Sequence, residues 1–162
     1  MEMKDHRNQH TKAHNKHYKH LLIMAILSFI TMYVLMYAMV DAFSNVFMNI
    51  NQFYMAGLMA SPMVMIELIV MRVMYTNKKV NMMLIGVSAI LLIGFFLLIR
   101  QQAGVGDKQF LKSMIPHHAG AILMCEEAYI KDPEIRKLCE QIRASQQAEI
   151  KQMKAKLNEL KK

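Results

Sequence analysis

Charged side chains are absent from long stretches of this chain. Residues 21–40 and 80–99 contain none, and residues 53–75 contain only Glu67 and Arg72. Each run is about long enough to cross a bilayer as a helix, which excludes the charge distribution of an ordinary soluble domain. The sequence therefore predicts three membrane spans within residues 21–100. The first run also lacks a small-residue cleavage site, so we interpret it as an uncleaved anchor.

Lysine and arginine are missing from the loop at residues 41–52. Basic residues are found instead in the histidine-rich tail at residues 1–20, and at Lys78 and Lys79 between the second and third spans. Because cytoplasmic segments retain positive charge, we expect a multi-pass protein of the cytoplasmic membrane. The N-terminus would be cytoplasmic, and the segment from Arg100 onward extracytoplasmic.

The sequence lacks the features that are typical of several functional classes. There is no surface of interleaved aromatic and basic residues of the kind that binds single strands, so the net charge of +8 does not indicate nucleic acid. No nucleophile, base and orienting residue stand in a recognisable arrangement. Glu149 is the only inward carboxylate evident, too few for a di-metal oxidase. We therefore expect that the protein is not an enzyme. Its long apolar runs make a lipid bilayer one expected partner.

A helical hairpin is predicted at residues 107–162, after a linker at residues 101–106. The first helix runs from about residue 108 to residue 130, with Asp107 as its cap. The second runs from residue 133 to about residue 160, because Asp132 followed by proline is a typical helix start.

Two helices of this length bury too little surface to be stable alone. We expect the hairpin to pair with a second copy, or to lie against its own spans. The predicted fold class is all-α: three transmembrane helices followed by an extracytoplasmic helical hairpin, which forms a four-helix bundle by homodimerisation.

Soft and borderline metal ligands recur on the first hairpin helix. Helical spacing places Met114 and His117 on one seam, and His118 and Cys125 on the adjoining seam, so that both histidines point toward the buried side. Thioether, imidazole and thiolate suit Cu(I) far better than Mg²⁺ or Ca²⁺. The alternative is that these imidazoles are only hydrogen-bonded to polar groups across the interface.

Polar residues near the histidines support either interpretation. Pro116 removes one backbone hydrogen bond, so we predict a kink beside His117 and His118. Gln146 and Glu149 lie on the inward seam of the second helix, and we expect them to provide the acceptors for the two imidazoles.

The run Met-Ile-Pro-His-His at residues 114–118, with Ser-Gln-Gln-Ala-Glu-Ile at 145–150 and then Met153, resembles the domain-of-unknown-function 305 family. That family is ferritin-like, helical and often associated with copper handling outside the cytoplasm. Longer members resemble two hairpins in one chain, whereas this sequence has one. The resemblance implies copper as Cu(I), or Ag(I), and copper-handling proteins as partners. It implies these metal ligands: Met114, His117, His118, Met153 and, as a further candidate, Glu149.

Cys125 and Cys139 lie seven residues on either side of Asp132, so an antiparallel hairpin brings them level. An extracytoplasmic location permits a disulfide, which would contribute about 3 kcal/mol. A reduced pair would instead add thiolate ligands to the cluster of histidine and methionine. Two unlinked core thiols are the third possibility, and the sequence leaves all three open.

Other features of the first hundred residues fit more than one function. Met55, Met59 and Met63 form a stripe that resembles the methionine ladder of eukaryotic copper-uptake transporters, or fills gaps between helices. Glu67, near the middle of the second span, should be neutral, paired or beside a hydrated cavity. The tail at residues 1–20 is either a histidine stripe that collects metal ions or a basic segment that faces anionic lipid. Its histidines are His6, His10, His14, His17 and His20.

The leading hypothesis is a membrane protein that sequesters Cu(I) or Ag(I), or hands it over, on the outer side of the cytoplasmic membrane. A metal-transport component with methionine-lined spans is the first alternative. A module that only dimerises or binds a partner is the second.

Overall fold

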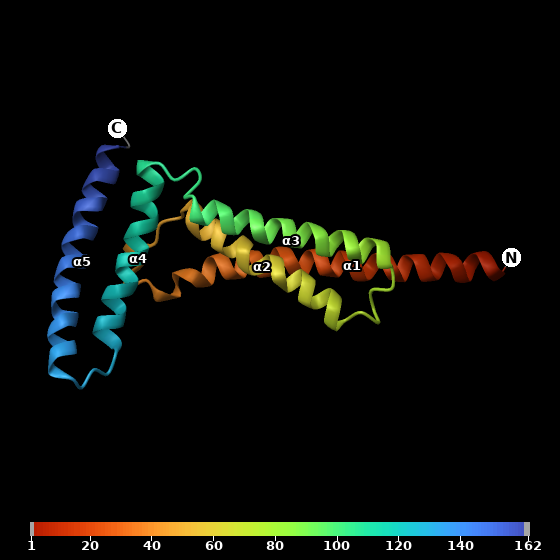
Figure 1. The fold of residues 1–162 in the computed structure, drawn as a ribbon, viewed down its shortest axis with the longest axis horizontal. Coiled ribbons are helices and arrows are strands. Elements are labelled where there is room, and N and C mark those ends of the chain that lie inside the picture. The colour runs from red at the N-terminus through yellow and green to blue at the C-terminus, as the bar shows by residue number, and fades with distance from the viewer. Residues whose placement is uncertain (1, 161–162) are drawn as a thin grey trace. The chain divides into compact units, whose positions relative to one another are not determined.

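The computed structural model describes residues 2–160 of the 162-residue chain, with side chains from Lys16 onward. Its regular structure in this range consists of helices (Figure 1). This confirms the predicted all-α fold class. In chain order the elements are α1 (Glu2–Leu35), η1 (Met36–Met39), η2 (Phe43–Asn45), α2 (Ile50–Val70), α3 (Lys78–Arg100), α4 (Asp107–Glu127) and α5 (Pro133–Glu159).

The chain forms two compact units. The span unit consists of Met1–Tyr33 and Tyr54–Gln101, and the hairpin unit of Val34–Phe53 and Gln102–Lys162. The sequence had assigned residues 34–53 to the membrane domain. In the structure they belong with the hairpin instead.

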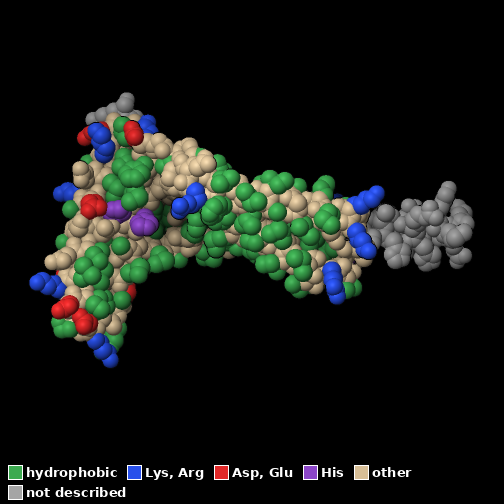
Figure 2. Space-filling view, in the orientation of Figure 1, with side chains coloured by type: hydrophobic (Ala, Val, Ile, Leu, Met, Phe, Trp, Pro, Cys, Tyr) green, Lys and Arg blue, Asp and Glu red, His purple; other side chains and the backbone are tan. Residues whose placement is uncertain are grey.

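Within the part of the chain that the structure describes, three segments are long and apolar enough to cross a membrane: Lys16–Met39, Ile50–Val70 and Lys78–Arg100. They match the three predicted runs apart from a few residues at the ends. Hydrophobic side chains cover much of the visible surface of these helices (Figure 2), and more than half of the Leu22 and Ile30 side chains is exposed. An apolar surface of this kind is compatible with the hydrocarbon interior of a bilayer.

Small residues of α2 line the interior of the span unit. Ala56, Gly57, Ala60 and Ser61 are all buried. A Cβ placed on Gly57 would lie 2.4 Å from the Phe95 ring of α3, so only glycine permits this approach. Membrane helices associate through such small-residue faces because lipid offers no hydrophobic driving force between them.

One end of the span unit is held by aromatic and polar contacts. The Tyr18 hydroxyl donates to Asn81 Oδ1 at 2.7 Å, and the Tyr18 and Tyr75 rings are 5.3 Å apart. Leu21, Leu68 and Tyr75 form a buried cluster beside them. The start of the first span and the loop between α2 and α3 therefore lie at the same end, as consecutive crossings require.

The predicted position of Glu67 in the middle of a span was wrong. The residue lies in the last turn of α2, which ends at Val70. The Tyr75 hydroxyl, just beyond the helix, donates to Glu67 Oε1 at 3.4 Å. The sequence placed Glu67 too deep because the apolar run continues to residue 75, whereas the helix ends earlier. Its carboxyl group is thus paired with a hydroxyl, one of the outcomes expected from the cost of burying it.

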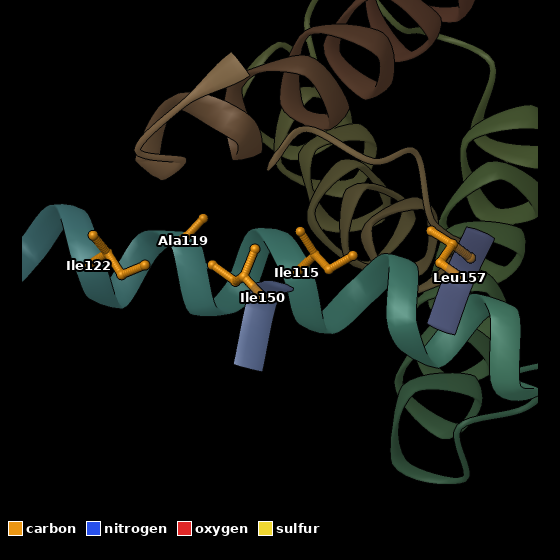
Figure 3. Packing of buried hydrophobic residues seen from close by; sticks show 5 residues of the cluster. All are labelled: Ile115, Ala119, Ile122, Ile150 and Leu157. Atoms are coloured by element: carbon orange, nitrogen blue, oxygen red, sulfur yellow. The ribbon is translucent and has the colours of Figure 1, made fainter. Parts of the chain in front are cut away.

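The core of the hairpin unit is a compact apolar cluster. Ile115, Ala119 and Ile122 lie on one face of α4, with Ile150 and Leu157 contributed by α5 (Figure 3). Ile115 and Ala119 have no exposed surface. The spacing of four and three residues along α4 places these side chains together because an α-helix turns once every 3.6 residues.

Residues 34–53 cover α4. Val40 and Phe47 pack against the apolar cluster. The backbone N–H of Ile50 donates to Gln109 Oε1 at 3.2 Å. A Cβ on the buried Gly120 would lie 3.4 Å from the Met39 carbonyl oxygen, which shows how closely η1 approaches the helix. The hairpin thus gains apolar cover from its own chain, and the loop after the first span lies on the same side as the hairpin.

The two hairpin helices start differently. Asp132 caps α5 as predicted, because its Oδ1 accepts from the backbone N–H groups of Glu134 at 2.8 Å and Ile135 at 3.0 Å. The predicted cap at Asp107 was wrong. Gly106 holds the cap position of α4 with no side-chain bond, and Asp107 is the first helical residue, where its charge complements the helix dipole.

Candidate functional site

His118 forms a direct polar link between α4 and α5 beside the apolar core. Its imidazole is 8% exposed, and its Nε2 lies 2.8 Å from Glu149 Oε2. Pro116, also buried, lies inside α4 two residues earlier, and the helix remains continuous through it. The predicted pairing of a histidine with Glu149 is therefore confirmed for His118.

Ser145 fixes the carboxylate of Glu149. Its hydroxyl donates to Glu149 Oε1 at 2.7 Å, from one turn earlier on α5. The hydrogen bonds from Ser145 and from His118 lower the pKa of the Glu149 carboxyl group below its ordinary value of 4.5. No role for Ser145 was predicted from the sequence. The four-residue spacing from Glu149 is the signal that could have found it.

The ionised carboxylate determines which ring nitrogen of His118 carries the proton. A carboxylate only accepts hydrogen bonds, so Nε2 must carry the hydrogen that it donates to Glu149. In the neutral imidazole, Nδ1 is then a bare lone pair. This Nδ1 is buried and has no hydrogen-bond partner among the described residues. A buried acceptor without a donor is costly, unless it coordinates something.

Two methionines lie one helical turn from the members of the His118–Glu149 pair. Met114 precedes His118 by four residues, and Met153 follows Glu149 by four. Because α4 and α5 run antiparallel (Figure 1), both methionines lie on the same side of the His118–Glu149 pair along the hairpin. Met114 is half-buried, and Met153 packs against the apolar cluster. One borderline and two soft donors are thus gathered on adjoining turns.

His117 does not share the environment of His118. The prediction that both histidines face the buried side was wrong for His117, which is exposed. Its ring centroid is 6.1 Å from that of His118, with the planes at 62°. Consecutive helical residues point about 100° apart, and the cluster around Ile115 and Ile122 fixes which of the two is turned inward.

Cys125 and Cys139 are brought together, as the level spacing predicted. Both are half-buried free thiols, and both line the same cavity. His118 precedes Cys125 by seven residues, which is about 10 Å along α4. The cysteines therefore form a separate pair near the loop. In the part of the chain that the structure describes, no group of three or more His, Cys, Asp or Glu side chains is placed to hold a metal ion.

The remaining metal-ligand candidates lie in the span unit. Met55 and Met59 are exposed on α2, so any conduit that they lined would have to run between copies of the chain. His6, His10 and His14 lie outside the residues whose side chains are described. His17 contacts the Tyr75 ring edge to face, and His20 is exposed.

The stability of the hairpin should depend on the charge of Glu149. Its pKa is lower in the folded than in the unfolded chain, so ionisation favours folding above pH 4.5, and this contribution is lost as the pH falls through the folded-state pKa. We expect the melting temperature of the full chain in detergent to fall more steeply below pH 4.5 than that of a Glu149→Gln variant. Parallel pH profiles for the two proteins would contradict this.

Comparisons with known proteins place the site in a recurring domain. A family model described as "Domain of unknown function (DUF305)" matches residues 98–157, which include α4 and most of α5. The "Uncharacterized protein L153" of Acanthamoeba polyphaga mimivirus is 39% identical over 114 residues, which are 69% of this chain and 73% of that protein. This stretch is longer than the segment matched by the family model, so the likeness extends beyond the hairpin. No solved structure matches the chain.

Proposed function

Because the chain belongs to the family described as Domain of unknown function (DUF305), we propose that its hairpin is a membrane-anchored binding site for a soft monovalent cation, Cu(I) or Ag(I). His118 Nδ1 and the thioethers of Met114 and Met153 would hold the ion. Glu149 would orient the imidazole through Nε2, as carboxylates commonly do for metal-bound histidine.

The observation that carries this proposal is the buried Nδ1 of His118. A structural histidine in a core would use both ring nitrogens, whereas this one has a partner at Nε2 and, among the described residues, none at the buried Nδ1. The nearby donors are thioethers, which select Cu(I) over hard cations. The described residues contain no group of three or more His, Cys, Asp or Glu side chains placed to hold a metal ion. The proposed site therefore depends on its methionines, and these determine which class of ion it binds.

His117 gives the proposed site a route to its surroundings. It is exposed and adjacent to the buried His118, with a centroid separation of 6.1 Å. A cation could bind first to the exposed imidazole and then pass to the buried set, or leave by the same route. This arrangement supports sequestration or transfer of the ion, and it requires no bond-making chemistry from the protein.

We propose that the hairpin works outside the cytoplasmic membrane. Residues 34–53 and the hairpin form one unit, and the intervening α2 and α3 make two crossings. Residues 41–52 have no lysine or arginine, as expected for a translocated loop. Trypsin added outside sealed spheroplasts should therefore remove the hairpin. Protection of the hairpin until the membrane is opened would reverse the orientation.

We also propose that the hairpin self-associates. Its own chain covers part of the surface for which a second copy was expected, since Ile122, Ile150 and Leu157 are buried within one chain. A further apolar set on α4 and α5 is more than half exposed: Phe110, Met124, Ile135 and Leu138. Exposed apolar patches of this kind commonly mark interaction surfaces.

Titration of the purified full-length protein with Cu(I) under reducing conditions tests the proposed function. We expect one tight site per chain, lost in a Met114→Ala/His118→Ala/Met153→Ala variant because all three proposed donors are removed. Met124→Ala is the matched control, since Met124 is on the same helix but 59% exposed. Equal affinity in the wild type and the triple variant would refute the site. The molecular mass measured in the same titration reports self-association.

A further inference from the structure

The loop end of the hairpin contains a pair of groups that the proposed ion site does not use. Cys125, near the end of α4, and Cys139, in the second turn of α5, are free thiols that line one cavity. A disulfide needs its two sulfurs at about 2.05 Å from each other, so closing the bridge requires the two antiparallel helices to bring these thiols to that distance.

A cavity of about 290 Å³ opens over the two thiols. It is lined by both cysteines and by charged residues, among them Glu126, Arg136 and Arg143. Arg136 donates to the Ile130 carbonyl oxygen at 3.3 Å, which ties the start of α5 to the loop. Arg143 lies 3.7 Å from Glu126 and links the two helices beside the thiols. The sulfurs are therefore held in place, yet accessible to a small molecule.

We propose that Cys125 and Cys139 are a redox site that closes into a disulfide between α4 and α5 by exchange with a small-molecule disulfide. One cysteine thiolate attacks a sulfur of the small disulfide, which releases one small thiol and leaves a mixed disulfide on the protein. The second cysteine then attacks the protein-bound sulfur and expels the second small thiol. The two cysteines lose two electrons and two protons, and the small disulfide gains them as two thiols.

The environment of Cys125 affects which thiol reacts first. Its interaction with Cys139 and its burial raise the pKa of the Cys125 thiol to about 11. Because the thiolate is the nucleophile, we expect Cys139 to attack the small disulfide first and Cys125 to close the bridge. The bridge would join the helices across the loop and preserve the register that places His118 opposite Glu149. Its formation requires no metal.

The test uses the full-length protein in detergent, equilibrated with mixtures of reduced and oxidised glutathione and then alkylated. As the mixture becomes more oxidising, both thiols should be lost to the alkylating reagent together, with the loss of two hydrogen atoms from the mass. After tryptic cleavage at Lys131, the peptides that contain Cys125 and Cys139 should stay joined until a reductant is added. Full alkylation of both thiols at every ratio, or a disulfide-linked dimer, would overturn the proposal.

Matched variants separate this site from the ion site. Cys125→Ser and Cys139→Ser should each stop at a mixed disulfide with glutathione, because the second thiol is missing. The Met114→Ala/His118→Ala/Met153→Ala variant should form the bridge at the same ratio of reduced to oxidised glutathione as the wild type. If it did not, the bridge would depend on the ion site and its independence would be refuted.

Discussion

Replacing His118 by alanine is expected to lower the affinity of the full-length protein for Cu(I) by at least about a hundredfold. Loss of a group that only orients a metal-bound histidine already costs about 10–100-fold in affinity, and removal of the ligand itself should cost more. His117→Ala is the matched control on the next residue. Because His117 is exposed and outside the proposed donor set, its loss should change the equilibrium affinity by less than about tenfold.

Competition with a Cu(I) chelator of known affinity would measure both effects. If His117→Ala weakened binding as much as His118→Ala, the buried Nδ1 would not be the centre of the site. A ligand set made from the two neighbouring imidazoles would then replace it. The rate at which the ion is released is a second readout, since His117 is proposed to act in the transfer of the ion and should affect this rate more than the affinity.

Replacing Gly57 by leucine should disrupt the span unit more than any comparable glycine substitution. A single Cβ at this position would already lie 2.4 Å from Phe95 Cε2, so a leucine side chain must displace the Phe95 ring and crowd the contact between α2 and α3. Overpacking of this kind costs about 1–3 kcal/mol. We expect a clear fall in the melting temperature of the full chain in detergent.

Gly86 provides the control for this substitution. A Cβ on Gly86 would meet no atom within 4 Å, so Gly86→Leu should leave the melting temperature nearly unchanged. Phe95→Ala, combined with Gly57→Leu, should recover part of the loss by making room for the new side chain. A Gly57→Leu protein as stable as the Gly86→Leu protein would show that α2 and α3 do not pack through Gly57.

Local patterns were enough to predict most of the secondary structure. The three apolar runs and the Asp132 cap were confirmed because each depends on residues close together in the sequence. The sequence was not used to predict which face of the spans packs against its neighbours. The face that the structure uses is the small-residue run around Gly57 and Ser61 of α2, where the four-residue spacing could have indicated it.

The sequence predicted which residues belong to the candidate site, but not how their side chains are arranged. Helical spacing predicted that both His117 and His118 face the buried side of the helix. Two neighbouring positions differ too little in this pattern for it to show which of them is buried. The tertiary contacts of Ile115 and Ile122 decide that His118 faces inward. Sequence spacing likewise predicted that Cys125 and Cys139 lie at the same level of the hairpin, and the structure adds the cavity that both of them line.

The sequence by itself determined the class of protein, because long uncharged runs and helix caps act over a few residues. It also determined which soft donors the hairpin carries. Only the tertiary structure decided that residues 34–53 cover α4, and that Glu149 binds His118 Nε2 while Nδ1 is buried and has no partner among the described residues. These relations join residues far apart in the chain, and burial together with the direction of each hydrogen bond arises only when the helices pack.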